Sequence, residues 1–351
     1  MARRAGEGVV SPAAAATLVG RWLAVALASA IAIISPALAQ RAATPQAMEV
    51  VSRPITQFHI GRPETRFGQL EFVGGLEMTS RGRHFGSFSA FRFLEPGSAF
   101  IGVADTGFWF FGSVERDAAG KPTGFADFRM AEMVDDTGRP RDKQNTDAEG
   151  LAVRDGVATV SFERIHRVSQ YKIAADGAMG PPLRDLPFLI PTRELRQNRG
   201  LETIAHAHPY GIHEGGLVVV SEKSLDPDGN IFAAIIEGPD KGIFKVKRHG
   251  EYDVTDGAFL PDGDLLLLER AFSISQGIRM RLRRIAGETI RKGALADGPI
   301  LLDADMSYQI DNMEGLDVWT RADGALMVSI VSDDNHSILQ RNLYLEFRLH
   351  D

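Results

Sequence analysis

Acidic side chains stand at both ends of short apolar runs in this chain. In the stretch DAEGLAVRDGVATVSFER, Glu149 precedes one run, residues 150–153, and Glu163 follows a second run, residues 157–162. The dipeptide Asp155-Gly156 between them is typical of a tight β-hairpin turn. Because the strands of a hairpin are antiparallel, we expect both carboxylates at the same end. Grouped carboxylate oxygens suit hard cations such as Ca²⁺, so the pattern predicts a cation-binding site.

The same pattern is found in five places along the chain. The first-strand positions in the other copies are Ser89, Glu202, Asp256 and Glu314. The second-strand positions in those copies are Asp105, Glu222, Glu269 and Asp333. The copies are aligned on Ala90, Gly150, Gly200, Gly257 and Gly315, which recur about every 50 to 60 residues. In this alignment Ser89 takes the place of an acid, and Glu202 lies after its glycine instead of before it.

A repeat of this length with several short strands in each unit is the signature of a β-propeller blade. Further strands are expected at residues 167–173, 231–236, 242–247 and 278–285, which supply about four strands to a unit. No long amphipathic helical run competes with them after the first 39 residues. We therefore expect an all-β fold, a β-propeller, and not an α/β fold.

The start of the chain has the features of a secretory signal peptide, residues 1–39. Three arginines precede or open an apolar stretch, residues 22–34, which is followed by Pro36 and by the small-residue cleavage motif Ala37-Leu38-Ala39. The alternative is an uncleaved membrane anchor. Cleavage before Gln40 would leave an N-terminal extension, residues 40–56, and a propeller domain, residues 57–351, in a periplasmic or secreted protein with no membrane span in its mature form.

The length of the mature chain predicts six blades, although only five repeats are visible. We expect the sixth blade to be completed by residues 57–61 and 70–78 pairing with the C-terminal residues 343–349, so that the ring is closed by N- and C-terminal strands. Five blades with an N-terminal extension is the alternative. The chain has 44% hydrophobic residues, no cysteine and a net charge of −7 without basic clusters, so we expect packing rather than disulfides to stabilise it, and no nucleic acid as partner. We expect a monomer.

In a propeller, the start of the innermost strand and the end of the next strand emerge on one face beside the central channel. The repeated acids therefore predict a carboxylate-lined funnel. Its expected metal ligands are Glu149, Glu202, Glu222, Asp256, Glu269, Glu314 and Asp333, with Ca²⁺ as the cofactor. Its expected catalytic residues are Glu149, Glu163 and Glu314.

Basic residues directly follow three of the second-strand acids. We interpret them as substrate-binding residues, together with a nearby histidine: Arg164, Lys223, Arg270 and His166. The alternative is that they form inter-blade ion pairs that hold the ring together. No Gly-x-Ser-x-Gly motif is present, and Ser161, Ser221 and Ser332 at the strand ends are expected to bond to the backbone rather than act as nucleophiles.

The ordered set of motifs resembles a known family. FSAF with ADTG, DAEGLAV with SFERIHRV, NRGLETIA with VVSEKS, DGAFLPDGDLLLLERAFS, and DNMEGLDV with SDDN are similar to the bacterial phytase-like proteins grouped as "esterase-like activity of phytase". The resemblance covers residues 72–349 and implies a β-propeller with ester or phosphoester hydrolase activity on a small-molecule substrate. A non-catalytic propeller that binds an envelope protein, a glycan or another ligand is the alternative.

Overall fold

The computed structural model describes residues 1–2, 43–140, 143–174, 177–195 and 200–350. By its internal contacts the chain divides into two units, Met1–Arg41 and Ala42–Asp351, and all of the elements below belong to the second. The predicted leader and its cleavage site lie almost wholly outside the described residues. No helix in the part of the chain that the structure describes is long and apolar enough to cross a membrane.

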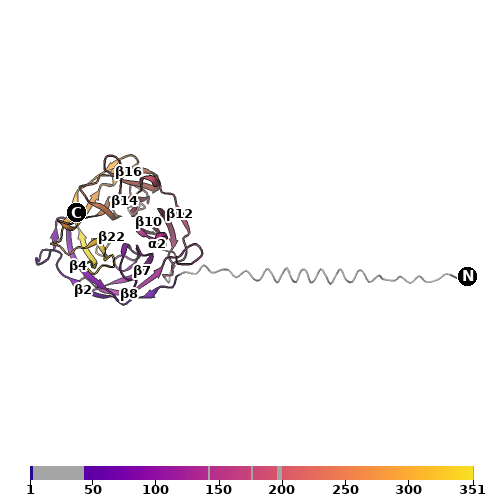
Figure 1. Cartoon of the computed structure of the whole chain (residues 1–351), viewed down its shortest axis with the longest axis horizontal. Helices are drawn as coiled ribbons and strands as arrows, with labels where there is room; N and C mark the ends of the chain where they lie inside the picture. The colour runs from indigo at the N-terminus through magenta and orange to yellow at the C-terminus, as the bar shows by residue number, and fades with distance from the viewer. Residues whose placement is uncertain (3–42, 141–142, 175–176, 196–199, 351) are drawn as a thin grey trace. The chain divides into compact units, whose positions relative to one another are not determined.

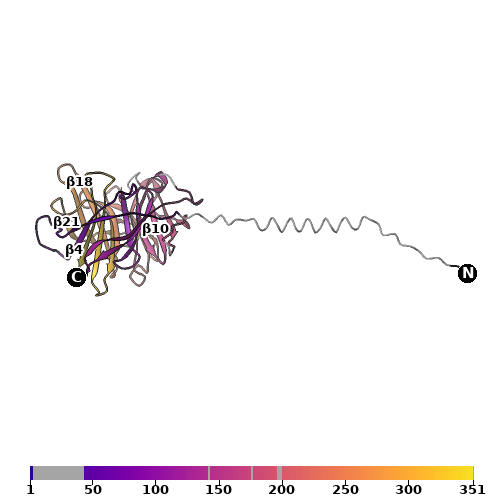
Figure 2. The same ribbon diagram turned by 90° about the horizontal axis from the view of Figure 1, so that it is seen from below.

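Five separate β-sheets form the blades of a propeller (Figure 1). The first strand of each blade contacts the first strand of the next, and these contacts close into a ring from β5 (Phe88–Phe93) through β9 (Ala148–Arg154), β13 (Leu201–His206) and β17 (Asp253–Phe259) to β22 (Asn312–Thr320). Viewed from the edge, the strands run across the thickness of the ring (Figure 2). The all-β propeller is confirmed.

Each inner strand continues outward into its own blade. The first blade adds β6 (Ala99–Ala104), β7 (Phe108–Arg116), β8 (Pro122–Glu132) and β1 (Gln46–Ala47). The second adds β10 (Val157–Phe162), β11 (Arg167–Lys172) and β12 (Arg184–Leu186). The third adds β14 (Leu217–Leu225), β15 (Ile231–Glu237), β16 (Gly242–Val246) and β20 (Leu295–Ala296). The fourth adds β18 (Leu265–Ser273), β19 (Gly277–Ile285) and β21 (Ile300–Ala304). Three short helical turns lie between the described strands: α2 (Lys143–Thr146), η1 (Thr192–Glu194) and η2 (Gly287–Thr289).

The fifth blade joins the two ends of the propeller, and Figure 1 shows the purple β4 in one sheet with yellow strands from the C-terminal part of the chain. It adds β23 (Leu326–Asp333), β24 (Asn342–Leu349), β4 (Leu70–Thr79), β2 (Val51–Ile55) and, paired with β4, β3 (Arg66–Phe67). The expected pairing of β4 with the C-terminal strand is present, with Leu345 opposite Gly75.

The prediction of six blades is wrong. The N- and C-terminal strands do not form a blade of their own, because the last repeat supplies only β22 to β24 and needs β4 and β2 to complete its sheet. Residues 57–61, which were expected to pair with the C-terminal strand, instead make a bridge between His59 and Tyr308.

The local sequence explains why these strands form. The hairpin β9–β10 turns at Asp155 and Gly156, which both have positive φ, 51° and 72°, as a type I′ turn requires. The inner strands β14 and β18 are buried on both faces because blades pack against each other on both sides, and they carry the continuous apolar runs LVVV and LLLL. Blades also pack through aromatic pairs: the rings of Trp109 and Tyr171, from neighbouring blades, lie 5.1 Å apart between centroids.

The centre of the ring is filled by Arg92 of β5. Its guanidinium is buried and bonds to Asp256 of β17 at 2.7 and 2.8 Å. The same nitrogens donate to the carbonyl oxygens of Ile204, Gly257 and Leu316. One side chain thus connects four of the five inner strands. It fills the channel between them, so a site at either end of the channel is bounded by Arg92.

Candidate functional site

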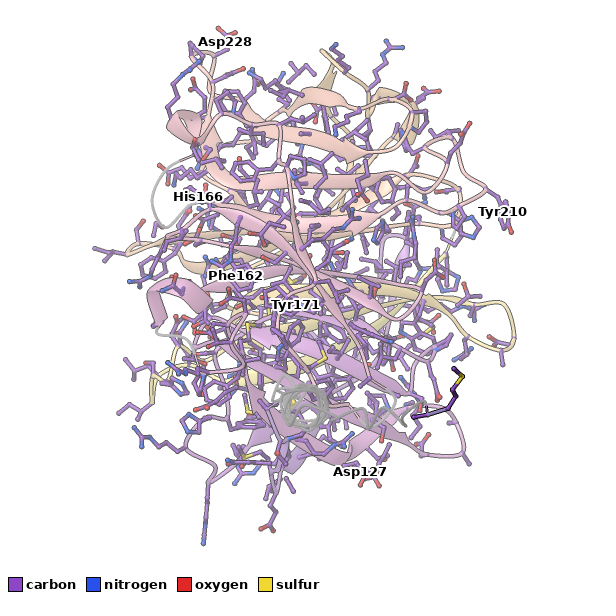
Figure 3. The ribbon with its side chains drawn as sticks, turned by 90° about the vertical axis from the view of Figure 1, so that its right-hand side faces the viewer. Asp127, Phe162, His166, Tyr171, Tyr210 and Asp228 are labelled. Carbon is purple, nitrogen blue, oxygen red and sulfur yellow. The ribbon has the colours of Figure 1, made fainter. Side chains whose placement is uncertain are left out.

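A small acidic pocket of about 170 Å³ lies at one end of the inner strands. Residues from all five blades line it: Ser89, Asp105, Glu149, Glu163, Glu202, Glu222, Arg270, Glu314, Asp333 and Asn335. Seven of these side chains are carboxylates, and Arg270 is the only basic one among the described residues in the lining. Figure 3 shows the ring from the side, with His166, which follows Glu163, on the left and Tyr210, in the turn after β13, at the right-hand edge.

Every blade has a β-bulge between its first two strands, and in four of the five the bulged first-strand residue lines the pocket. In the first, third and fifth blades the pairing of the two inner strands skips Ser89, Glu202 and Glu314. In the second blade it skips Glu149 and Gly150 opposite Ser161. A bulged residue is left out of the ladder and its side chain is redirected, which is why bulges recur beside functional sites. Glu202 is therefore equivalent to Glu149 and Glu314, and its offset in the sequence does not displace it in space.

The fourth blade departs from the sequence alignment by one residue on both strands. Its bulge falls at Thr255, so Asp256 is paired with Leu268 and reaches the buried Arg92 instead of the pocket. On the second strand Arg270, and not Glu269, occupies the row of Asp105, Glu163, Glu222 and Asp333. The blade thus has a threonine at the bulge and contributes Arg270 to the pocket where the second strands of the other four blades contribute acids.

Two of the predicted metal ligands therefore lie outside the pocket. Asp256 is held by Arg92 in the channel, and Glu269 is buried against Arg283, whose Nε donates to its Oε1 at 2.8 Å. A carboxylate that already has a buried guanidinium partner is neutralised where it stands. Asp256 and Glu269 were predicted as ligands because the sequence alignment on Gly257 does not show where the bulge lies.

Burial and mutual repulsion dominate the electrostatics of the pocket. Burial raises the pKa of Glu149 well above its ordinary value, and the charges of Glu163 and Asp147 raise it further. Burial likewise raises the pKa of Glu202, with repulsion from Glu149 and Glu163. Burial raises the pKa of Asp333 to about 8, with Glu314 as the largest contributing charge. The pocket thus holds protons near neutral pH unless a cation replaces them.

Two groups of three carboxylates are spaced to hold a cation. Asp147, Glu149 and Glu163 form one, Glu163, Glu202 and Glu222 the other, and within each the ligand oxygens lie within 4.8 Å of one another. Glu163 belongs to both groups, and its Oε1 accepts a hydrogen bond from the N–H of Gly200 at 2.5 Å. Within the described residues no donor reaches the carboxylates of Glu149 or Glu202. Carboxylate oxygens this close together fit a hard divalent cation, and each group includes one of these two side chains, Glu149 or Glu202.

Glu314 is held in place from one side only. Arg270 and Asn312 both donate to its Oε1, from Nη1 of Arg270 at 2.7 Å and from Nδ2 of Asn312 at 2.8 Å. No donor within the described part of the chain reaches its Oε2. Burial raises the pKa of Glu314, although Arg270 acts against the rise. Glu314 thus lines the pocket with one oxygen anchored by two donors and the other available to a ligand.

The other predicted cationic residues make ion pairs beside the pocket. Arg164 bonds to Asp147, and Lys223 lies 2.9 Å from Asp253. His166 is half-buried next to Gly200, and burial lowers its pKa. Only Arg270 of the four lines the acidic pocket itself.

Two contributing side chains were not singled out from the sequence. Asp147 precedes Glu149 by two residues and Asn312 precedes Glu314 by two, so in both repeats the same strand places a second polar group near the first. That shared spacing is the signal that could have found them. The serines at the strand ends serve the backbone: Ser161 donates to the carbonyl of Leu201 and Ser332 to that of Arg341.

The sequence matches a known protein family over the part of the chain that carries these side chains. A profile of the phytase-like family, described as esterase-like activity of phytase, matches residues 83–336. The chain belongs to this family. The matched span includes both inner strands of every blade, so the whole acidic pocket of this phytase-like propeller lies within it. No curated protein matches the chain significantly.

Solved structures show only distant similarity to this phytase-like propeller. A putative oxidoreductase (glucose dehydrogenase) from Thermus thermophilus is 14% identical with a TM-score of 0.40, covering 79% of this chain and 99% of its own. An endo-arabinase from Bacteroides thetaiotaomicron is 14% identical with a TM-score of 0.44, covering 72% and 90%. A PQQ-bound aldose sugar dehydrogenase from Streptomyces coelicolor is 12% identical with a TM-score of 0.39, covering 87% and 100%. Scores this low carry no argument about the reaction.

Proposed function

We propose that this protein is a metal-assisted hydrolase of an ester or phosphoester, with its site in the acidic pocket. The observation that carries the proposal is the convergence of seven carboxylates from four blades on one pocket with a single arginine. So many buried like charges are unfavourable without a counter-ion, and functional sites are where such perturbed groups gather. Membership of the phytase-like family supports the same class of reaction.

The two carboxylate groups that share Glu163 would hold the cation, for which Ca²⁺ is our first candidate. When bound, a divalent cation polarises the ester or phosphoryl oxygen as a Lewis acid. Glu149 and Glu163 are then ligands more than acid–base groups. Glu202 and Glu222 complete the set.

Glu314 and Asp333 are left to move protons. Glu314 Oε2 is the free oxygen of an anchored carboxylate, which suits a general base. In the proposed step it takes a proton from water, the water oxygen bonds to the ester carbon or phosphorus, and the bond to the leaving oxygen breaks. That oxygen takes a proton from Asp333, which its raised pKa keeps protonated near neutral pH. Arg270 holds Glu314 and faces the developing negative charge.

The test is hydrolysis of 4-nitrophenyl acetate and 4-nitrophenyl phosphate with added Ca²⁺ and with chelator. Glu314→Gln should lower kcat by about 10²-fold or more, since it removes the base but keeps the shape. Asp228→Asn, an exposed acid on the β14–β15 turn, is the matched control and should leave kcat unchanged. Turnover that survives both chelation and Glu314→Gln would refute the mechanism. Binding of either 4-nitrophenyl ester by the protein without any hydrolysis would favour the alternative of a non-catalytic binding propeller.

Export to the periplasm or the medium is part of the proposal. It is supported by the leader-like residues 1–39 and by a cysteine-free chain. N-terminal sequencing of the protein from the cell envelope fraction should give a product beginning near Gln40. An intact N-terminus on cytosolic protein would contradict it.

A further inference from the structure

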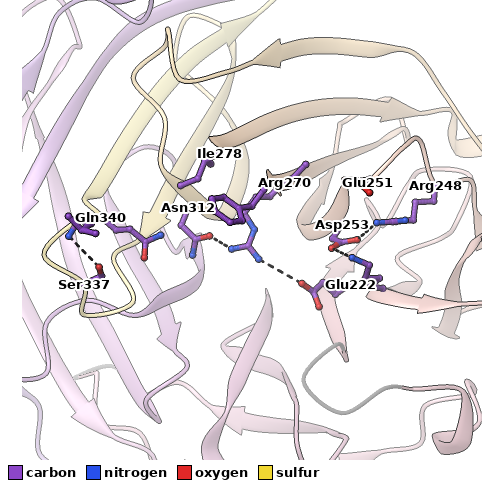
Figure 4. Close-up of a pocket in the computed structure, with 13 residues that line it drawn as sticks. Glu222, Arg248, Glu251, Asp253, Arg270, Ile278, Asn312, Ser337 and Gln340 are labelled. Atoms are coloured by element: carbon purple, nitrogen blue, oxygen red, sulfur yellow. Dashed lines mark hydrogen bonds and ion pairs between the residues drawn. The ribbon is translucent and has the colours of Figure 1, made fainter. Parts of the chain in front are cut away.

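A larger groove opens beside the acidic pocket, as Figure 4 shows in close-up. It has a volume of about 810 Å³, against about 170 Å³ for the acidic pocket. Binding sites for small molecules commonly have volumes of about 300–1,000 Å³, so the groove can take a substrate and the acidic pocket only a reacting group with its ions. Glu222 and Arg270 line both spaces, so the groove and the acidic pocket adjoin at these two side chains.

The groove has an apolar wall at its outer end. Phe272 and Ile278 from the β18–β19 hairpin face it, and so does Leu339 from the β23–β24 loop. Phe272 and Leu339 are 67% and 87% exposed, which is unfavourable for large apolar side chains that have nothing to cover them. Phe272 follows Arg270 by two residues on one strand, so the apolar wall begins directly beside the cation at the border of the acidic pocket.

The cations of the groove are already paired. Arg270 contacts Glu222 and Glu314, and Figure 4 shows it between Glu222 and Asn312. Lys223 and Arg248 both bind Asp253, at 2.9 and 2.7 Å. The acidic pocket brings seven carboxylates together with one arginine, so every carboxylate that loses its proton there adds negative charge that Arg270 alone cannot balance. A densely charged anion would have to break these pairs and approach this negative field.

We infer that the substrate of the proposed hydrolase is an uncharged carboxylic ester with an apolar acyl or aryl group. The ester would sit at Arg270, at the mouth of the acidic pocket, and its apolar part on Phe272, Ile278 and Leu339. The inference rests on the proposed function for the reaction, but it selects one substrate class within it. The same arrangement of charges disfavours a polyphosphorylated substrate.

Two 4-nitrophenyl esters, the acetate and the hexanoate, test the inference through turnover. The wild-type protein should prefer the hexanoate, and Phe272→Ala should raise KM for the hexanoate on the order of tenfold while leaving the acetate unchanged, because only the longer acyl group reaches the wall. Ile274→Ala is the matched control, since Ile274 is 98% exposed on the same hairpin but does not line the groove. Release of phosphate from myo-inositol hexakisphosphate should not occur.

Binding of the amide analogue N-(4-nitrophenyl)hexanamide, measured by calorimetry, separates the groove from the reaction. Binding that weakens with Phe272→Ala but not with Ile274→Ala supports the groove even where no ester is hydrolysed, and only the proposed function then fails. The inference would be overturned, and the proposed function left standing, by any of three results. These are ester turnover that is unchanged by Phe272→Ala, amide binding that is unchanged by Phe272→Ala, and a preference for the hexakisphosphate over the esters.

Discussion

Arg92 and Asp256 form a two-pronged ion pair in the central channel, with Nη1 2.7 Å from Oδ2 and Nη2 2.8 Å from Oδ1. The carboxylate in turn accepts the N–H groups of Gly257 and Leu316 at 2.7 and 2.8 Å. Both charges are buried, and each has its hydrogen bonds filled by the other and by the inner strands. The acidic pocket is therefore separated from the opposite face by a neutral, fully bonded pair.

Breaking that pair should destabilise the propeller strongly. Arg92→Leu leaves Asp256 buried without a counter-charge, and we expect a loss of about 3–5 kcal/mol in the free energy of unfolding, measured with urea. Arg92→Leu combined with Asp256→Leu should recover part of the loss, because no charge is then left unpaired. Equal stabilities of the single and double variants would show that the pair is not the cause.

The stability of the protein should fall as the pH rises toward 8. Asp333 has a pKa of about 8 in the folded protein, against 3.8 ordinarily, so between these values the folded state keeps a proton that the unfolded state has lost. The free energy of unfolding then decreases with pH by about 1.4 kcal/mol per unit for one such group. Asp333→Asn should flatten the slope in melting experiments from pH 5 to pH 8. If the slope is unchanged in Asp333→Asn, other acidic side chains cause the pH dependence of stability.

Ca²⁺ can distinguish the acidic side chains that are proposed to bind a cation from those that form structural ion pairs. Ca²⁺ at about 100 times its dissociation constant should stabilise the protein by roughly 2.7 kcal/mol. Glu163→Gln should abolish most of this gain, since Glu163 belongs to both carboxylate groups. Glu269→Gln should lower the melting temperature through Arg283 but keep the Ca²⁺ response. A lost response in Glu269→Gln alone would mean that the fourth blade supplies ligands after all.

Removing the closing strand should open the ring. Deletion of residues 343–349 exposes the edges of both β4 and β23, and we expect aggregation, measured by light scattering after size-exclusion chromatography. Deletion of Gln46 and Ala47, the short outer strand of the first blade, is the control and should leave the protein monodisperse. A 343–349 deletion that melts like the full chain would exclude this closure.

The repeat, the hairpin turns and the funnel of acids could all be predicted from spacing alone, because apolar runs and Asp-Gly turns determine which strand ends share a face. The number of blades could not be predicted in this way. The number of residues from β4 to β24 does not show whether the terminal strands form a blade of their own or complete the last repeat. Nor could the fourth blade, where a bulge at Thr255 shifts Asp256 and Glu269 by one residue. A shift of one residue sends a strand side chain to the other face of the sheet, and a bulge leaves no mark in composition.

The pairing of β4 with β24 also has a consequence in time. A ribosome makes β4 before almost the whole propeller and β24 after it, so the growing chain holds an unpaired β4 edge until β24 has been made. The ring therefore cannot close blade by blade from the first repeat, and its closure waits for the last strand of the fifth blade.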